Sequence, residues 1–357
     1  MTKDFECKRL IATATKPCAA FVFLPAMSVK ELRWLCWVIM SVAAVASAQQ
    51  VADPNFDAKV ESPTYRSRHP RVAIDQAHNN FHTLDGRYKP LADLLRNDGY
   101  DVAAHGTTFT PSSLKGIGVL IVANALAADS DGERSDPAFT DDECKTVYEW
   151  VKGGGSLFLI ADHAPFGTAA APLAARFGVT LGKGFVFDSD SNAIDGDHAT
   201  FMVFSEDNKL LGDHPITRGR GAAERLHKLI AFTGESMTVP KGAVVLLRLS
   251  PLAGEAPSRE DMQKLLVANG AVQTEAKLAA AAKRWPPAGR AQAIAFRVGK
   301  GRVVINGEAG MLSAQVFVEK NANGTETISG QMGMNVPGTD DRQYALNVLH
   351  WLSGLLN

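Results

Sequence analysis

Two ionisable residues, Asp162 and His163, stand directly after the apolar run at 156–161. The run is short, three glycines precede it, and a proline and a glycine follow it closely, which is typical of a buried parallel strand. In open α/β sheets, ligands bind just beyond the carboxyl ends of such strands. Because burying ionisable groups without partners is costly, this position indicates a functional site. Asp162 and His163 are therefore candidate catalytic residues.

A second junction of this kind follows the predicted strand at 71–74 and carries Asp75, His78 and His82. Carboxylates and imidazoles are ligands that bind divalent metals in proteins. The spacing alone does not establish a metal site, because the asparagines at 79–80 disfavour a helix that would place both imidazoles on one face. The alternative is a loop whose side chains form hydrogen bonds with neighbouring backbone groups.

The third junction follows the predicted strand at 302–305 and carries Glu308, which glycines flank at 307 and 310. Glycine lets the backbone approach a ligand closely. Asn124 ends a further predicted strand at 117–123 and is a candidate ligand-binding residue. Since the ends of parallel strands share one edge of a sheet, we expect the acids and imidazoles of the three junctions to lie in one pocket.

Two chemistries follow from such a cluster. With a divalent metal, imidazoles and one carboxylate are the ligands, and a second carboxylate deprotonates a metal-bound water. Without a metal, His163 or Glu308 acts as a general base and the other groups bind a polar ligand. The candidate catalytic residues are Asp162, His163 and Glu308; the candidate ligand-binding residues are Asp75, His78, His82 and Asn124; the candidate metal ligands are His78, His82 and Asp162.

The surrounding elements alternate between strands and helices. A helix is predicted to begin at Pro90, and a capping box of Thr140 and Glu143 begins another. The alternation predicts an α/β fold with a doubly wound, mostly parallel sheet in a single domain at 49–357. The stretch at about 251–289 interrupts the pattern and is expected to be an insertion with two helices.

Composition excludes some functions. The chain has 357 residues, of which 46% are hydrophobic and 21% charged, with a formal net charge of −1. A nucleic-acid partner is not expected, because phosphate binding requires a basic face. The sequence contains no Gly-x-Ser-x-Gly elbow, phosphate loop or dinucleotide fingerprint. A small-molecule ligand is the expected partner.

The N-terminal region has the features of a targeting segment. Basic residues after Met27 precede an apolar run at 34–45 and the small residues at 46–48. This order predicts that 1–48 is a signal peptide with an over-extended start, its true start lying near Met27. The alternative is a membrane anchor, but the apolar run is short for a span. We expect a mature periplasmic or secreted chain that begins near Gln49 and has no stable membrane span.

Several stretches resemble the class I glutamine-amidotransferase-like superfamily, in particular a branch that lacks the cysteine nucleophile. The resemblance lies in residues 74–82, 149–156, 160–166, 307–309 and 347–352. It implies a flavodoxin-like sheet and a functional junction after Ala161. Members with amidotransferase activity carry a nucleophilic cysteine there, and a histidine and a glutamate on a later loop.

This sequence departs from that pattern. Asp162 and His163 replace the cysteine, and Gly307-Glu308 lies where His-Pro-Glu is expected. Glutamine hydrolysis through a thioester is therefore not expected. Relatives without the cysteine include trehalose-utilisation-like proteins and domains attached to transport or ciliary machinery, and some of these resemble non-catalytic binding modules.

Two functions are compatible with these observations. The clustered acids and imidazoles favour an exported hydrolase, with or without a divalent metal, that acts on a small polar or carbohydrate-like substrate. The missing nucleophile favours a non-catalytic ligand-binding or scaffold module of the same fold. We favour the hydrolase and keep the module as the alternative.

Overall fold

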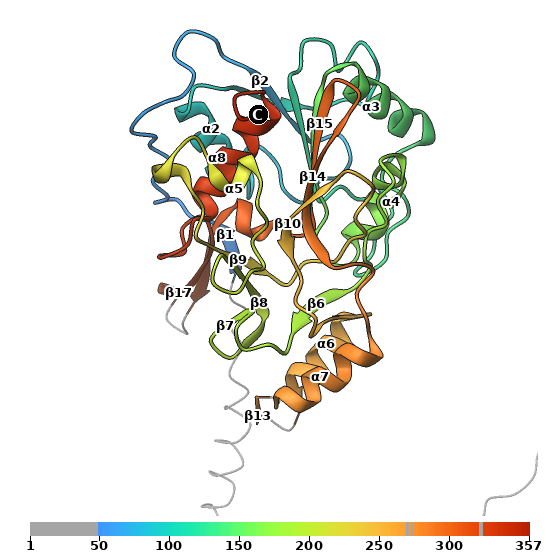
Figure 1. Ribbon diagram of the computed structural model, residues 1–357, viewed down its shortest axis with the longest axis vertical. Coiled ribbons are helices and arrows are strands. Elements are labelled where there is room, and N and C mark those ends of the chain that lie inside the picture. The colour runs from blue at the N-terminus through green and yellow to red at the C-terminus, as the bar shows by residue number, and fades with distance from the viewer. Residues whose placement is uncertain (1–48, 269–270, 273, 321–323) are drawn as a thin grey trace, which may run out of the picture. The chain divides into compact units, whose positions relative to one another are not determined.

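A seven-stranded sheet forms the centre of the fold in the computed structural model, which describes residues 49–268, 271–272, 274–320 and 324–357 (Figure 1). In spatial order, its strands are β10 (Val244–Arg248), β14 (Ala291–Val298), β15 (Gly301–Asn306), β5 (Ser156–Ile160), β4 (Val119–Ala123), β2 (Arg71–Asp75) and β3 (Asp101–His105). The five strands from β15 to β3 are parallel to one another, and β14 is antiparallel to β10 and to β15. The predicted mostly parallel α/β sheet is confirmed.

The central strands are apolar along their whole length because both faces of the sheet are covered. All five residues of β4 and of β5 are buried. Along β5, Phe158 and Ile160 pack into the core on one face, whereas Leu157 and Leu159 pack into the core on the other. This alternation is the period of two that an extended chain imposes.

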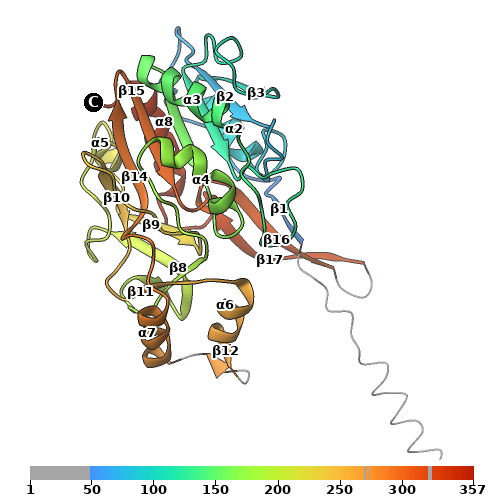
Figure 2. The ribbon, with the colours of Figure 1, turned by 90° about the vertical axis from the view of Figure 1, so that its right-hand side faces the viewer.

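Helices cover both faces, so the sheet is doubly wound, as predicted (Figure 2). The core that contains Phe158 includes α2 (Lys89–Asn97) and α8 (Asp341–Leu352). The core that contains Leu157 includes α3 (Asp141–Gly153) and α4 (Phe166–Arg176). The predicted capping box is present at the start of α3. Helix α4 begins at Phe166, so Asp162 and His163 lie just ahead of a helix.

Smaller sheets surround the site end of the fold. They are β1 (Gln49–Ala52) with β16 (Ala314–Lys320) and β17 (Glu326–Gly333); β7 (Ile194–Asp195) with β8 (His198–Ser205) and β9 (Lys228–Phe232); β6 (Phe185–Asp188) with β11 (Ala253–Ala256); and β12 (Val267–Ala268) with β13 (Ala271–Val272). Three short helices complete the connections, namely α5 (Pro215–Arg218), η1 (Ala222–Glu224) and η2 (Gly310–Leu312). Sequence patterns did not predict β1, β9, β16 or β17.

The two helices expected within 251–289 are α6 (Arg259–Leu266) and α7 (Glu275–Arg284). They pack with β6 around a small core of their own that includes Phe187, Met262 and Leu278. Figure 2 shows the pair beside β11 and away from the central sheet. Among the described residues, no helix is both long and apolar enough to cross a membrane. The predicted signal peptide at 1–48 lies outside the described residues.

Candidate functional site

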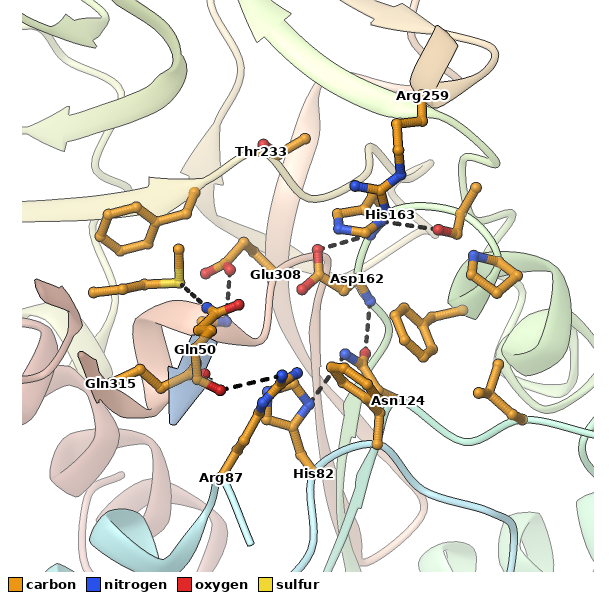
Figure 3. Close-up of a pocket in the computed structure, with 18 of the residues that line it drawn as sticks. Gln50, His82, Arg87, Asn124, Asp162, His163, Thr233, Arg259, Glu308 and Gln315 are labelled. Atoms are coloured by element: carbon orange, nitrogen blue, oxygen red, sulfur yellow. Dashed lines mark hydrogen bonds between the residues drawn. The ribbon is translucent and has the colours of Figure 1, made fainter. Parts of the chain in front are cut away.

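A cavity of about 430 Å³ opens where β4, β5 and β15 end (Figure 3). One polar residue of the cavity lies one or two positions after the end of each strand. Loops and small sheets supply the other polar residues that line the cavity. The polar residues labelled in Figure 3 are Gln50, His82, Arg87, Asn124, Asp162, His163, Thr233, Arg259, Glu308 and Gln315. The volume lies within the range of about 300–1,000 Å³ that is usual for small-molecule sites.

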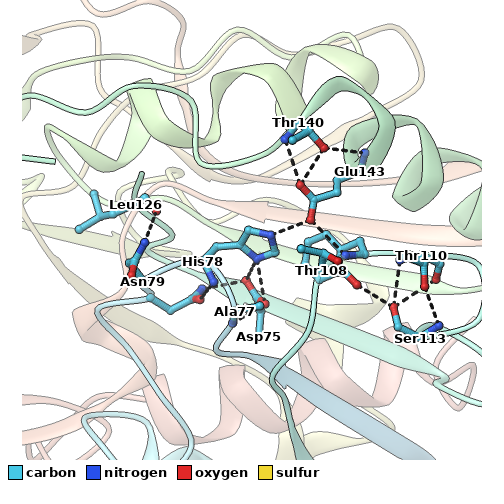
Figure 4. Close-up of polar contacts among 12 residues, drawn as sticks. Asp75, Ala77, His78, Asn79, Thr108, Thr110, Ser113, Leu126, Thr140 and Glu143 are labelled. Carbon is cyan, nitrogen blue, oxygen red and sulfur yellow. Dashed lines mark hydrogen bonds and ion pairs between the residues drawn. The ribbon is translucent and has the colours of Figure 1, made fainter. Parts of the chain in front are cut away.

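The structure brings most of the sequence-predicted residues into this cavity. Those that line it are His82, Asn124, Asp162, His163 and Glu308. Asp75 and His78 do not line it. They lie in a separate buried cluster with Glu143 at the start of α3 (Figure 4).

A chain of hydrogen bonds fixes the protonation of His82. The backbone N–H of Asp162 donates to Asn124 Oδ1 at 2.9 Å. The Asn124 atom that faces His82 is therefore the amide nitrogen, Nδ2. Asn124 Nδ2 lies 3.2 Å from His82 Nδ1 and must donate to it. Burial, together with the charge of Arg87, lowers the pKa of His82 to about 3. His82 is therefore a neutral imidazole that carries its hydrogen on Nε2.

Glu308 is the most enclosed acid of the cavity, with 1% of its surface exposed. Its two carboxyl oxygens accept the backbone N–H groups of Gly310 and Met311. These bonds favour the ionised form, but burial and the nearby charge of Asp162 raise the pKa of Glu308 well above its ordinary value. The protonated form is thus favoured, and Glu308 is the group of the site suited to donate a proton.

His163 is held with one ring nitrogen free. Its backbone N–H donates to Asp162 Oδ1 at 2.7 Å, and its ring lies against Phe185 with 4.6 Å between the ring centroids. Nδ1 lies 2.9 Å from the carbonyl oxygen of Ala164, which can only accept, so Nδ1 carries a hydrogen. In a neutral ring, Nε2 then keeps its lone pair, and no described residue donates to it.

The cluster around His78 ties the loop after β2 to α3. Nδ1 lies 2.9 Å from Asp75 Oδ2, and Nε2 lies 3.0 Å from Glu143 Oε1. Because both acceptors are carboxylates, both ring nitrogens carry hydrogens and the imidazole is charged. Burial lowers the pKa of His78, but the hydrogen bonds and charges of Asp75 and Glu143 raise it above the ordinary value. Such a ring has no lone pair to give to a metal.

The candidate metal ligands are accordingly divided between two places. His78 lies in the Asp75–Glu143 cluster, whereas His82 and Asp162 line the cavity. Within the described ranges, no group of three or more His, Cys, Asp or Glu side chains is arranged to hold a metal ion. The residues present do not fit a metal centre formed by His78, His82 and Asp162, and the chemistry below uses none.

Sequence reasoning missed several residues of the cavity. Arg87 precedes α2 and belongs to no pattern that indicates a site. Gln50 and Gln315 come from β1 and β16, which the sequence did not predict. Arg259 is the first residue of α6, and its Nε lies 3.5 Å from Glu133 Oε1. These side chains enter the cavity through contacts between distant segments, which local sequence patterns do not record.

Comparison with known proteins adds information on the fold. No known protein family matches the chain, and no curated protein sequence does. The mmIFT52 N-terminal domain is similar in structure with a TM-score of 0.52 and 15% identity, over 80% of this chain and 97% of that one. A ThuA-like protein from Bacteroides uniformis has a TM-score of 0.38 and 13% identity, over 82% of this chain and 95% of that one. A second ThuA-like protein, from Parabacteroides merdae, has a TM-score of 0.37 and 11% identity, over 80% of this chain and 91% of that one. At these identities the likeness concerns the fold alone.

Proposed function

We propose that this chain is an exported hydrolase that acts on a small, hydroxyl-rich, carbohydrate-like substrate. We also propose that it belongs to the branch of the class I glutamine-amidotransferase-like superfamily that lacks the cysteine. The observation that carries the proposed activity is the convergence of Asp162, His163 and Glu308 in one cavity. The three come from the ends of two neighbouring parallel strands, the position where α/β sheets bind ligands.

In the proposed reaction, Glu308 is the general acid and His163 is the general base. His163 Nε2 accepts a proton from a water molecule, whose oxygen forms a bond to the substrate carbon. As the bond between that carbon and the leaving oxygen breaks, Glu308 gives its proton to the leaving oxygen. The carboxylate of Asp162 stabilises the positive charge that His163 acquires. Proton transfer from His163 through solvent to Glu308 then restores both groups.

The lining of the cavity supports the substrate class. Aromatic rings and polar groups line it together, which suits a ligand that has apolar C–H faces and hydroxyl edges. The aromatic residues are Phe81, Phe166, Phe201 and Phe232. Carboxyl, amide and imidazole groups bind hydroxyls because each of them accepts or donates hydrogen bonds in fixed directions.

One observation favours the alternative, a non-catalytic binding module. The carboxyl of Glu308 already accepts the first N–H groups of η2, which gives it a structural role that needs no reaction. A binding site of this kind would hold the same hydroxyl-rich ligand without turnover. The two functions therefore differ in chemistry and agree on the ligand.

Turnover by wild type, His163→Ala and Glu308→Gln on a panel of 4-nitrophenyl glycosides and acetylated sugars tests the proposal. We expect kcat to fall by about 100-fold or more in each variant, the usual contribution of a general acid or base. Activity of the wild type should persist in excess EDTA and should decline as pH rises through the raised pKa of Glu308. His227→Ala, at an exposed histidine outside the cavity, is the matched control.

Circular dichroism must show that each variant is folded. Ligand binding by the wild type without any turnover would favour the module over the hydrolase. Full activity in His163→Ala would remove the proposed base. If no sugar derivative on the panel is hydrolysed or raises the melting temperature, the proposed ligand class is wrong.

A further inference from the structure

Arg87 is a cation of the cavity that has no acidic partner among the described residues. Its guanidinium carbon lies 4.0 Å from the centroid of the Phe81 ring, and Nη2 lies 3.5 Å from the backbone oxygen of Gln50. The side chain is half-buried, and burial lowers its pKa. By contrast, Arg259 on the other side of the cavity has a carboxylate partner, Glu133. Arg87 has therefore lost part of its hydration without gaining an ion pair.

The contacts that Arg87 does make leave most of its hydrogen-bonding capacity unused. A guanidinium carries five N–H donors in a planar fork. The single contact to the Gln50 carbonyl is at the long limit for a hydrogen bond. The contact with the Phe81 ring supplies no oxygen or nitrogen acceptor to the N–H edge of this fork. The N–H groups of Arg87 can therefore donate to an acceptor group of the ligand.

His82 adds a second donor beside Arg87. Because Asn124 donates to Nδ1, the hydrogen of His82 lies on Nε2, and no described residue accepts it. The charge of Arg87 contributes to the low pKa of His82. Figure 3 shows both side chains at one end of the cavity. That end offers donors and one positive charge.

The other side of the cavity has the opposite character. Asp162 and Glu308 place their carboxyl groups there, and Figure 3 places them away from Arg87, with His163 beyond them. A ligand that matches both ends needs an anionic acceptor at one end and hydroxyl donors at the other. A neutral sugar would satisfy the carboxyl end only.

We propose that the ligand is a sugar acid whose carboxylate is bound by Arg87 and by His82 Nε2–H, with its hydroxyls directed towards Asp162 and Glu308. This inference rests on the proposed function, whose ligand class it narrows. A carboxylate fits because a planar guanidinium pairs with it through two parallel hydrogen bonds. The single positive charge of the guanidinium balances the single negative charge of the carboxylate, and the neutral imidazole adds one hydrogen-bond donor.

Calorimetric titration with two matched pairs of probes tests this assignment: D-glucuronate against D-glucose, and D-galacturonate against D-galactose. Within each pair only the carboxylate differs from a hydroxymethyl group. We expect the wild type to bind one of the acids at least tenfold more tightly than its neutral parent. In Arg87→Gln the ratio of the two affinities should fall to about one, and in Arg87→Lys it should be intermediate.

Arg68→Gln, at an exposed arginine outside the cavity, should keep the wild-type preference. Circular dichroism checks the fold of each variant, and the lysine variant serves if the glutamine variant is unfolded. Equal affinity for acid and neutral sugar would overturn the inference and leave the proposed function standing. A preference that survives in Arg87→Gln would also overturn it. If neither acid nor neutral sugar binds, the proposed function fails and this inference fails with it.

Discussion

At the scale of single residues, Glu235 is the least satisfied charge-bearing group near the site. Its side chain is fully buried, and neither carboxyl oxygen has a partner among the described residues. Glycine makes room for it, since a Cβ built on Gly167 would lie 1.7 Å from Glu235 Oε2. Burial, then the charges of Glu255 and Asp162, raise the pKa of Glu235 well above its ordinary value. Burial therefore favours the protonated form of Glu235.

This placement makes stability depend on pH. Because the pKa of Glu235 is higher in the folded than in the unfolded chain, its contribution is full below the unfolded value of 4.5 and is lost as pH rises through the folded value. Glu235→Gln is neutral at every pH. We expect the variant to gain stability relative to wild type as pH rises, reaching about 1–3 kcal/mol at pH 9, measured by urea unfolding at pH 5, 7 and 9.

Glu149→Gln, at an exposed glutamate on α3, should follow the wild-type curve at all three values. A difference between wild type and Glu235→Gln that stays constant from pH 5 to pH 9 would show that Glu235 has the same protonation in the folded and unfolded chains, and would contradict the raised pKa.

At the scale of elements, the Asp75–His78–Glu143 cluster joins β2 to α3 on one side of the site. Glu143 is the N3 residue of α3, where one carboxyl oxygen completes the capping box with Thr140 and the other accepts from His78 (Figure 4). Burial raises the pKa of Glu143, but hydrogen bonds from His78 and Thr140 lower it more. The start of the helix and the loop after β2 are thus held by the same carboxylate.

Replacing the imidazole should loosen this junction most at low pH. The folded pKa of His78 lies above its unfolded value of 6.5, so its stabilising effect is full below 6.5 and is lost as pH rises through the folded value. We expect His78→Gln to lower the free energy of unfolding by about 3–5 kcal/mol at pH 5.5, the cost of breaking a buried ion pair, and by less at pH 9. His227→Gln is the exposed control, and a loss equal at both pH values would contradict the charged state of His78.

The same cluster shows where sequence reasoning reached its limit. The strand-end rule placed Asp162, Asn124 and Glu308 correctly in one cavity because parallel strands end at a common edge. The same rule did not predict that His78 and His82 lie in different places, because their directions depend on the loop between them. Asn79 has a φ of 46°, a left-handed conformation that turns the chain between the two histidines. The periodicity of apolar residues along a sequence does not predict such a turn.

Element prediction followed a similar division. The central strands and the long helices were predictable because burial of one or two faces imposes a repeating apolar pattern. Strand β1 was not, because it is stable only through pairing with β16, in which Gln49 lies opposite Val318. Pairing over such a distance in sequence leaves no local pattern. Gln50 and Gln315 were missed for this reason.

At the scale of the whole molecule, the cavity joins parts of the chain that are far apart in sequence. Gln50 comes from β1, Arg259 from α6 and Gln315 from β16, while the central sheet supplies the acids. The small sheet that carries Gln50 and Gln315 is separate from the seven-stranded sheet. A ligand that contacts all of these segments gains free energy only when they are folded together. Binding should therefore stabilise the peripheral segments as well as the strand ends.

Hydrogen–deuterium exchange with and without the tightest-binding sugar acid checks this coupling. At a concentration of 100 times Kd, ligand linkage stabilises the folded chain by about 2.7 kcal/mol. We expect slower exchange in peptides that cover β1, β16 and the start of α6, in addition to those that follow β5. Strand β3 forms the far edge of the central sheet and contributes no residue to the cavity lining, so it provides the internal reference. Protection confined to residues 162–166 would mean that the ligand contacts the strand ends alone and that the peripheral segments take no part in binding.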